Sequence, residues 1–516
     1  MSSSQDPTRD EDAYIEGDEA DEVINRDEDH PMESDGEDED QDMTFEQEIT
    51  LENDSAAHFD SHNDSVFCIA QHPIHNHIVV TGSGDDTAYI FDSTPNEARP
   101  VLPKSYESDP QPRRERDSLK PILKLEGHTD TVNAVAFTEP KGEYVVTAGL
   151  DGKLRAWRDA TAQGTGGAWQ YVAEMQEVEE INWVAVCPSE KGDEGKSNVI
   201  ALGANDGSAW VFRIDHRDAS QPISIVQSFF QHTGSCTAGA WTPDGKLLAT
   251  VSEDGSFYVY DVFGEAAAAG VAYSAGTNAV VGLTAEDQRF AVEGGLYAVT
   301  ISPGGSIAAV GGAEGHIRVV GLPRLAPAGG PAAAKVKGKN VSQASTGASA
   351  AGTILASLQA QGDGVETLSF SSPPLTLLAA GSVDGSIALF DAAHRFAVRR
   401  HIRDAHEGAV VKVEFLQSRA PGGPVPRPNP IASAAAGQGQ TWLLTSVGMD
   451  GIVRRWDARG GTAAAAHGLL KEWKGHLGLV ENSEGEQSGG IMAFVQSTDG
   501  KRVVTAGDDG ISLVFE

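Results

Sequence analysis

The chain has 516 residues, of which 40% are hydrophobic, so it is long enough to bury a sizeable core. Its formal net charge is −37, and about 22 of these negative charges lie in the first 60 residues. Such a field repels nucleic acid and favours basic partners, although acidity can also serve solubility alone. The three cysteines form no CxxC pair, which argues against a disulfide framework or a zinc site and for a reducing compartment.

The N-terminal region, residues 1–43, is predicted to be a disordered acidic tail. It has acidic runs such as Glu37 to Asp40 and almost no aromatic residues, so burial cannot offset the entropy cost of ordering. It is either a mobile arm that helps to collect a basic ligand or a solubility tail. No apolar stretch typical of a signal peptide occurs in it, and no run of about 18 apolar residues predicts a membrane span.

The next segment, Thr44 to Leu51, alternates between apolar and polar residues. Phe45, Ile49 and Leu51 would share one face of a β-strand. No partner for a hairpin lies nearby in the sequence, so we expect this strand to pair with a distant part of the chain.

From there on, one unit recurs about eight times. Each copy has an apolar run, then a second run, a tight turn led by an acidic residue, and a strand that closes on an aromatic residue. The acidic residue and the closing residue are six positions apart in every copy, which indicates a true repeat. The pairs are Asp85 and Phe91, Asp151 and Trp157, Asp206 and Phe212, Asp254 and Tyr260, Glu314 and Val320, Asp384 and Phe390, Asp450 and Trp456, and Asp509 and Phe515.

A unit this short cannot bury its own apolar face, so the copies should stack as four-stranded blades of one all-β propeller of eight blades, over residues 44–516. The last copy stops after its third strand. We expect the strand 44–51 to supply the fourth and to close the ring. Insertions at about 93–120, 323–352 and 416–440 should form loops on the bottom face, opposite the Asp-Gly turns.

Two copies contain a histidine, a hydroxyl residue, an aspartate and a tryptophan at equivalent positions. A catalytic triad is a poor interpretation, because an enzyme needs such a set only once. We interpret both as hydrogen-bonded struts, in which the imidazole donates to the carboxylate and accepts from the hydroxyl. The sets are His128, Thr147, Asp151 and Trp157, and His406, Ser446, Asp450 and Trp456.

Motifs for phosphate, dinucleotide or metal binding are missing from the sequence, so we expect no catalytic residues, metal or cofactor. The short basic clusters Arg113 to Arg116 and Lys335 to Lys339 lack interleaved aromatics, so direct binding of nucleic acid is not expected.

Unrepeated carboxylates mark the expected binding surface. In a propeller of this kind, the Asp-Gly turns and the segments that lead into the innermost strands share the top face. Carboxylates gathered there would make a negative funnel for a Lys/Arg-rich peptide, or an ordinary solvated rim. The residues are Asp64, Asp130, Glu179, Glu180, Glu253, Glu366, Glu407, Glu484 and Glu486, with Trp183 as a nearby aromatic.

The pattern Gly-His … Asp … Trp-Asp resembles that of WD-repeat proteins over residues 44–516, although Glu314 and Val320 of copy five depart from it. More specific phrases are His62 to Cys68, Val178 to Trp183 and Ser446 to Arg459. With the acidic N-terminus and eight copies, they look like the fungal SQT-type ribosome-assembly family and its animal relative, angio-associated migratory cell protein.

That resemblance implies a dedicated chaperone without enzyme activity. Its partner would be the basic N-terminal segment of a newly made large-subunit ribosomal protein, of the universal L-sixteen or L-ten-e type. The chaperone would shield this segment in the cytoplasm, with the nucleus also possible, and deliver it to pre-60S particles. It implies a monomer that contacts neither nucleic acid nor membrane directly.

Two other function classes stay open from the residues alone. One is a general WD-repeat scaffold, such as a ubiquitin-ligase substrate adaptor or a histone-tail reader, which usually needs an appended domain. The other is a propeller enzyme, which needs a polar cluster that breaks the repeat. We find neither feature in the sequence.

Overall fold

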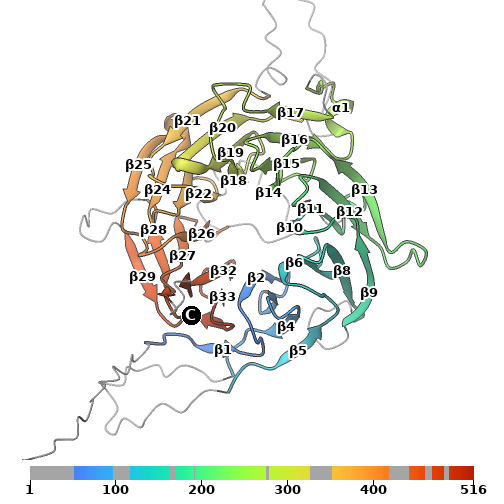
Figure 1. The fold of residues 1–516 in the computed structure, drawn as a ribbon, viewed down its shortest axis with the longest axis vertical. Helices are drawn as coiled ribbons and strands as arrows, with labels where there is room; N and C mark the ends of the chain where they lie inside the picture. Colours follow the sequence, from blue (N-terminus) through green and yellow to red (C-terminus); the bar gives the residue numbers. More distant parts are fainter. Residues whose placement is uncertain are drawn as a thin grey trace, which may run out of the picture. The chain divides into compact units, whose positions relative to one another are not determined.

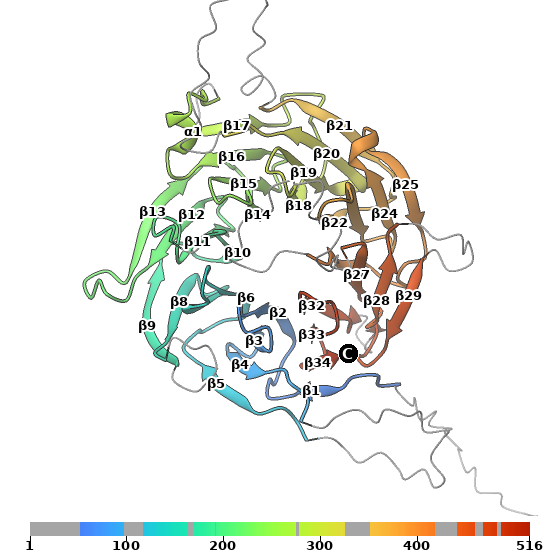
Figure 2. The ribbon, with the colours of Figure 1, turned by 180° about the vertical axis from the view of Figure 1, so that it is seen from behind.

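Eight four-stranded antiparallel sheets are arranged as blades of a ring in the computed structural model (Figure 1, and from behind in Figure 2). The structure describes residues 52–96, 117–161, 169–190, 192–274, 278–325, 351–417, 441–459, 468–481 and 487–516. The chain separates into two units, residues 1–50 and 51–516, and the ring belongs to the second. The predicted eight-bladed propeller is therefore confirmed, whereas the predicted tail, the strand 44–51 and most of each insertion lie outside the described residues.

The strands of a blade follow one another from the inside of the ring outward, and the blades follow in chain order. Blade 1 consists of β2 (Val66–Gln71), β3 (Ile78–Ser83), β4 (Ala88–Asp92) and β5 (Pro121–Leu125). Blade 2 consists of β6 (Val132–Phe137), β7 (Tyr144–Gly149), β8 (Lys153–Asp159) and β9 (Trp169–Gln176). Blade 3 consists of β10 (Ile181–Val186), β11 (Val199–Ala204), β12 (Ala209–Ile214) and β13 (Ile223–Phe229).

The next three blades repeat this order. Blade 4 consists of β14 (Cys236–Trp241), β15 (Leu247–Ser252), β16 (Phe257–Asp261) and β17 (Ala279–Leu283). Blade 5 consists of β18 (Leu296–Ile301), β19 (Ile307–Gly312), β20 (His316–Gly321) and β21 (Ile354–Gln359). Blade 6 consists of β22 (Val365–Phe370), β23 (Leu377–Ser382), β24 (Ile387–Asp391) and β25 (Ala397–Ile402).

The last two blades complete the ring. Blade 7 consists of β26 (Val410–Phe415), β27 (Leu443–Gly448), β28 (Val453–Asp457) and β29 (Leu469–Trp473). Blade 8 consists of β32 (Ile491–Gln496), β33 (Val503–Gly507), β34 (Ser512–Phe515) and β1 (Ala57–Phe59). Smaller elements are α1 (Glu265–Ala268), the 3₁₀ turns Ala313–Gly315 and Ala392–His394, and the ribbon of β30 (Val480–Glu481) and β31 (Gln487–Ser488). No helix in the described ranges is long and apolar enough to cross a membrane.

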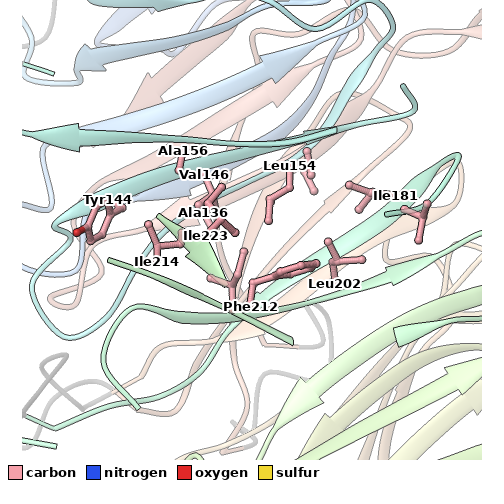
Figure 3. Packing of buried hydrophobic residues seen from close by; sticks show 14 of the residues in the cluster. Ala136, Tyr144, Val146, Leu154, Ala156, Ile181, Leu202, Phe212, Ile214 and Ile223 are labelled. Carbon is pink, nitrogen blue, oxygen red and sulfur yellow. The ribbon is translucent and has the colours of Figure 1, made fainter. Parts of the chain in front are cut away.

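The second strand of each blade packs between its neighbours and has almost no exposed surface. In β7, Val145 and Val146 are completely buried, as the apolar β-branched run predicts. Figure 3 shows Val146 and Leu154 of blade 2 facing Leu202 of blade 3. The turn that follows β7 has Gly152 at φ 71°, a conformation that L side chains rarely adopt, which explains the recurring glycine.

The ring is closed by β1, not by the predicted strand 44–51. Ala57 lies opposite Val514 of β34, so β1 takes the outer position of blade 8. Phe59 is fully buried and its ring stacks on Phe91 of blade 1, with centroids 4.2 Å apart. The prediction of an N-terminal closing strand was right in kind, but the strand was misplaced. Three residues are too few to give an alternation signal, and Phe45 to Leu51 gave a longer one.

Candidate functional site

The two predicted struts lie inside their blades. His128 Nδ1 is 3.0 Å from Asp151 Oδ1, and its Nε2 is 2.7 Å from Thr147 Oγ1. Burial lowers the pKa of His128 despite the nearby carboxylate, which favours a neutral ring that donates to the aspartate and accepts from the hydroxyl. Trp157 packs edge-to-face against Tyr171, and among the described contacts no hydrogen bond joins it to Thr147.

The second strut is more complete. His406 Nδ1 is 2.9 Å from Asp450 Oδ1, and its Nε2 is 2.8 Å from Ser446 Oγ. Trp456 Nε1 donates to Ser446 Oγ at 2.8 Å. These bonds run in one direction, from indole to hydroxyl to imidazole to carboxylate, so each buried polar group has a partner.

Equivalent struts occur in three further blades. The histidines are His62, His232 and His476, and each has its Nε2 within hydrogen-bond distance of a threonine hydroxyl, at 2.9, 2.7 and 2.6 Å. All three side chains are completely buried. His232 differs at its other nitrogen, because Nδ1 lies 2.6 Å from Ser256 Oγ and 4.0 Å from Asp254 Oδ1. Five buried histidines that share the bond to a hydroxyl support a structural role, because a buried group cannot meet a substrate.

We call the end of the ring that carries the Asp-Gly turns the top face. The bond from His128, which lies between β5 and β6, to Asp151, which lies between β7 and β8, shows that both kinds of connection share this end. Seven predicted carboxylates occur in connections or strand starts at this end, and all are exposed: Asp64, Asp130, Glu179, Glu180, Glu253, Glu366 and Glu407. Glu484 and Glu486 lie outside the described residues.

Each of the eight innermost strands has a β-bulge after its first residue. The second residue is skipped by the pairing, and its side chain is exposed or half-buried, whereas the first residue is buried. The skipped positions therefore form one ring of side chains at the top face. In blade order they are Phe67, Asn133, Asn182, Thr237, Tyr297, Glu366, Val411 and Met492.

Four of these eight residues meet in one cleft. The cleft has a volume of about 440 Å³ and is lined by residues of blades 3 to 6: Asn182, Asn205, Ser235, Thr237, Glu253, Tyr297 and Glu366. It brings together two predicted carboxylates, Glu253 from a turn and Glu366 from an inner strand. A third, Glu180, accepts a 2.9 Å hydrogen bond from Asn205 Nδ2 at the edge of the cleft.

The two carboxylates of the cleft have no hydrogen-bond or ion-pair partner among the described residues. Glu366 keeps an exposed surface, but the surrounding protein displaces part of its water, and this desolvation, together with the charge of Asp363, raises its pKa. The ionised form of Glu366 is therefore destabilised in the free protein, and a bound cation would stabilise it. This combination makes the cleft a candidate binding site for an ammonium or guanidinium group.

Asp363 is an acidic residue that the sequence analysis missed. It lies two residues before its inner strand begins, the position that Asp64, Asp130 and Glu179 hold in their copies. An alignment of the eight copies at that position would have found it.

The other predicted site residues lie outside the cleft. Asp64 and Asp130 accept hydrogen bonds from the backbone of the residue that follows each, at 2.7 Å. Trp183 Nε1 donates to Cys236 O at 3.1 Å, and its indole fills the space above Gly203 and Gly239. Trp183 therefore packs between blades 3 and 4.

A larger cleft of about 1000 Å³ opens at the bottom of blades 7 and 8. Two of its carboxylates are already paired with cations: Asp457 with Arg459 at 2.7 Å, and Glu516 with Arg502 at 3.0 Å. The third, Asp499, accepts a hydrogen bond from Ser497 Oγ at 2.6 Å. No cluster of three or more potential metal-ligating side chains occurs in the ranges that the structure describes.

Four segments match the family model of the WD domain, G-beta repeat: residues 53–92, 119–158, 223–261 and 352–391. Each match begins in the outer strand of one blade and ends in the third strand of the next. The first match therefore includes β1, which explains why this strand completes blade 8.

The chain is also similar to known proteins along most of its length. It is 48% identical to Chaetomium thermophilum Sqt1, crystallised with the N-terminus of ribosomal protein L10, over 90% of this chain and all of that one, with a TM-score of 0.70. It is 29% identical to the ribosome assembly protein SQT1 of Saccharomyces cerevisiae, over 45% of this chain and 48% of that protein, about half of its length. Human angio-associated migratory cell protein is 23% identical over 90% of this chain and 80% of its own.

Proposed function

Because the chain belongs to the Sqt1 family of WD-repeat ribosome assembly proteins, we propose that it is a dedicated chaperone for the N-terminal segment of ribosomal protein L10. A basic side chain of that segment would enter the top-face cleft between Glu253 and Glu366. The observation that carries this proposal is the pair of unpartnered carboxylates in one cleft, one of them with a raised pKa.

The chemistry of the cleft suits capture by charge. A Lys or Arg side chain there would gain charge-assisted hydrogen bonds from Glu366 and Glu253, and amide and hydroxyl groups would complete its coordination. The net charge of −37 would speed the encounter with a basic segment. We propose binding without catalysis, release to pre-60S particles, and a cytoplasmic or nuclear site of action, as befits ribosome assembly.

Reversing the charge of the cleft tests this function. Glu366→Lys is expected to weaken binding of an L10 N-terminal peptide at least about 30-fold, because it replaces an attraction by a like-charge repulsion in a confined space. Glu253→Lys should act in the same direction. Fluorescence anisotropy with a labelled peptide at about 0.15 M salt gives the dissociation constants.

The matched control is Glu194→Lys, which reverses an exposed carboxylate between β10 and β11, at the bottom of blade 3. It changes the net charge equally and should alter affinity less than about threefold. Equal losses for Glu366→Lys and Glu194→Lys would refute the cleft as the site. Affinity purification that recovered histones or ubiquitin-ligase subunits instead of L10 would refute the chaperone function.

Binding should also weaken at low pH. A bound cation stabilises ionised Glu366, so its pKa, raised in the free chain, must fall in the complex, and binding releases a proton near the free-state value. Affinity should be constant above the pKa of the free chain and fall by up to about tenfold per pH unit below it. A titration between about pH 8 and about pH 4 measures this. The affinity of Glu366→Gln should depend less on pH than that of the wild-type chain. If the two affinities changed in parallel with pH, the role of Glu366 would be contradicted.

A further inference from the structure

The ring of skipped residues at the top face is divided by chemistry. Blades 2 to 6 contribute a continuous polar arc of Asn133, Asn182, Thr237, Tyr297 and Glu366. Blades 7, 8 and 1, which are also contiguous, contribute Val411, Met492 and Phe67.

Most of the polar arc serves the ring itself. Asn133 Nδ2 donates to Ile181 O at 2.6 Å, Asn182 Nδ2 donates to Cys236 O at 3.0 Å, and Thr237 Oγ1 donates to Leu296 O at 2.6 Å. In each case the acceptor is the first residue of the next inner strand. Valine, methionine and phenylalanine can make no such bond. Val411 packs against the apolar core of blades 7 and 8, whereas the side chain of Phe67 is exposed.

The apolar arc extends onto the connection that leads into blade 8. Leu477 is 47% exposed, Leu479 is 41% exposed, and Phe67 on the neighbouring blade is 39% exposed. Leu479 Cδ1 lies beside Gly408 of blade 7, next to the predicted carboxylate Glu407. Exposed apolar side chains that gather at one face of a protein usually mark a surface that contacts another molecule.

We propose that this apolar arc binds an aromatic or aliphatic side chain of the same basic segment whose cation enters the cleft. We define the apolar arc as Phe67, Val411, Met492, Leu477 and Leu479. The inference rests on the proposed function. Its argument is continuity, because Val411 follows Glu366 directly in the ring of skipped residues, and one extended segment that crosses the axis meets both.

This division explains how an acidic face can be selective. Charge alone attracts any Lys/Arg-rich segment and mainly sets the rate of encounter. An apolar contact at a fixed place in the same ring admits only segments with an apolar residue at a matching distance from the basic one. The apolar arc therefore sets specificity, while the cleft sets attraction.

The test uses two peptides and the full chain. One peptide is the L10 N-terminal segment of Chaetomium thermophilum, and in the other every aromatic and aliphatic residue is replaced by serine, with Lys and Arg kept. Phe67→Ser with Met492→Ser is expected to weaken binding of the first peptide about tenfold or more and to leave the already weaker second peptide within about twofold. Glu366→Gln should weaken both and should also reduce the salt dependence, which the apolar variants preserve.

Leu355→Ser on the outer strand β21 is the control, since it removes an apolar side chain of similar exposure, 47%. Thermal melts show whether each variant is folded. If the double variant bound the first peptide as tightly as the wild-type chain does, the proposal for the apolar arc would be wrong, while the proposed function would stand. The same holds if the double variant lost affinity equally for both peptides. Failure of the wild-type chain to bind the first peptide would overturn the proposed function, and the apolar arc with it.

Discussion

Removal of residues 1–60 is expected to open the ring and to lower the free energy of unfolding by about 5 kcal/mol or more. The deletion takes away β1, so β34 loses its antiparallel partner and the fully buried Phe59 no longer stacks on Phe91. The edge of β34 becomes exposed, which invites aggregation. Because domains are stable by about 5–15 kcal/mol, much of the population should be unfolded or aggregated. Urea unfolding followed by circular dichroism, together with gel filtration, measures both effects.

The matched control removes residues 1–51 and keeps β1. It also keeps Glu52, whose carboxylate lies 3.2 Å from Lys474 Nζ. This shorter deletion should leave the melting temperature within a few degrees of the full chain. The single substitution Phe59→Ala should cost about 3–5 kcal/mol in a chain of full length. If the 1–51 deletion were as damaging as the 1–60 deletion, closure would depend on the segment 44–51 and the assignment of β1 would be wrong.

The architecture was predictable because the sequence repeats the pattern of one blade eight times. A turn that needs Gly152 at positive φ and a closing aromatic six residues after the acidic one recur in nearly every copy, so errors in one copy do not matter. The closing strand is harder to predict, because it is far in the sequence from the other strands of its blade. The segments that match the family model start at or just before an outer strand, so β1 is at the start of the first segment although it belongs to blade 8.

The cleft was predictable only in part. Glu253 and Glu366 were among the expected carboxylates because charge is visible in a sequence. Thr237 and Tyr297 were not, because a β-bulge decides which residue of an inner strand turns outward. Asn205 lies in the turn after β11 and carries no charge that would mark it. Trp183 follows the skipped Asn182, and its indole packs between two blades.

Stability and binding use different residues of the same repeat. The struts occupy positions that recur, and each is buried inside one blade. Glu366 of the cleft and Phe67, Val411 and Met492 of the apolar arc occupy skipped positions, where the residue type differs from blade to blade. A substitution in a strut should therefore affect folding and leave affinity unchanged, and a substitution of Glu366, Phe67 or Met492 should do the reverse.

Asp450→Ala provides the sharpest test of that separation. The carboxylate accepts from His406 Nδ1 at 2.9 Å and from Arg454 Nη1 at 2.6 Å, and its side chain is only 5% exposed. Its removal leaves the buried imidazole without its carboxylate and the guanidinium with Glu472 alone, which should cost about 3–5 kcal/mol of unfolding free energy. Below the melting temperature, affinity for the L10 peptide should remain within about twofold of wild type.

The role of Asp450 can also be tested by the pH dependence of the free energy of unfolding. Burial alone would raise the pKa of Asp450, but the hydrogen bond from His406 and the charge of Arg454 hold it at about 2. Since the folded value lies below the unfolded one, the stabilisation is complete above about pH 4 and is lost as the pH falls towards 2. Asp450→Ala should abolish this part of the acid sensitivity. Asp457→Ala is the control in the same blade, and loss of its exposed pair with Arg459 should cost less than about 1 kcal/mol. If Asp450→Ala unfolded like Asp457→Ala, or abolished peptide binding while folded, the strut would not be the structural element that we describe.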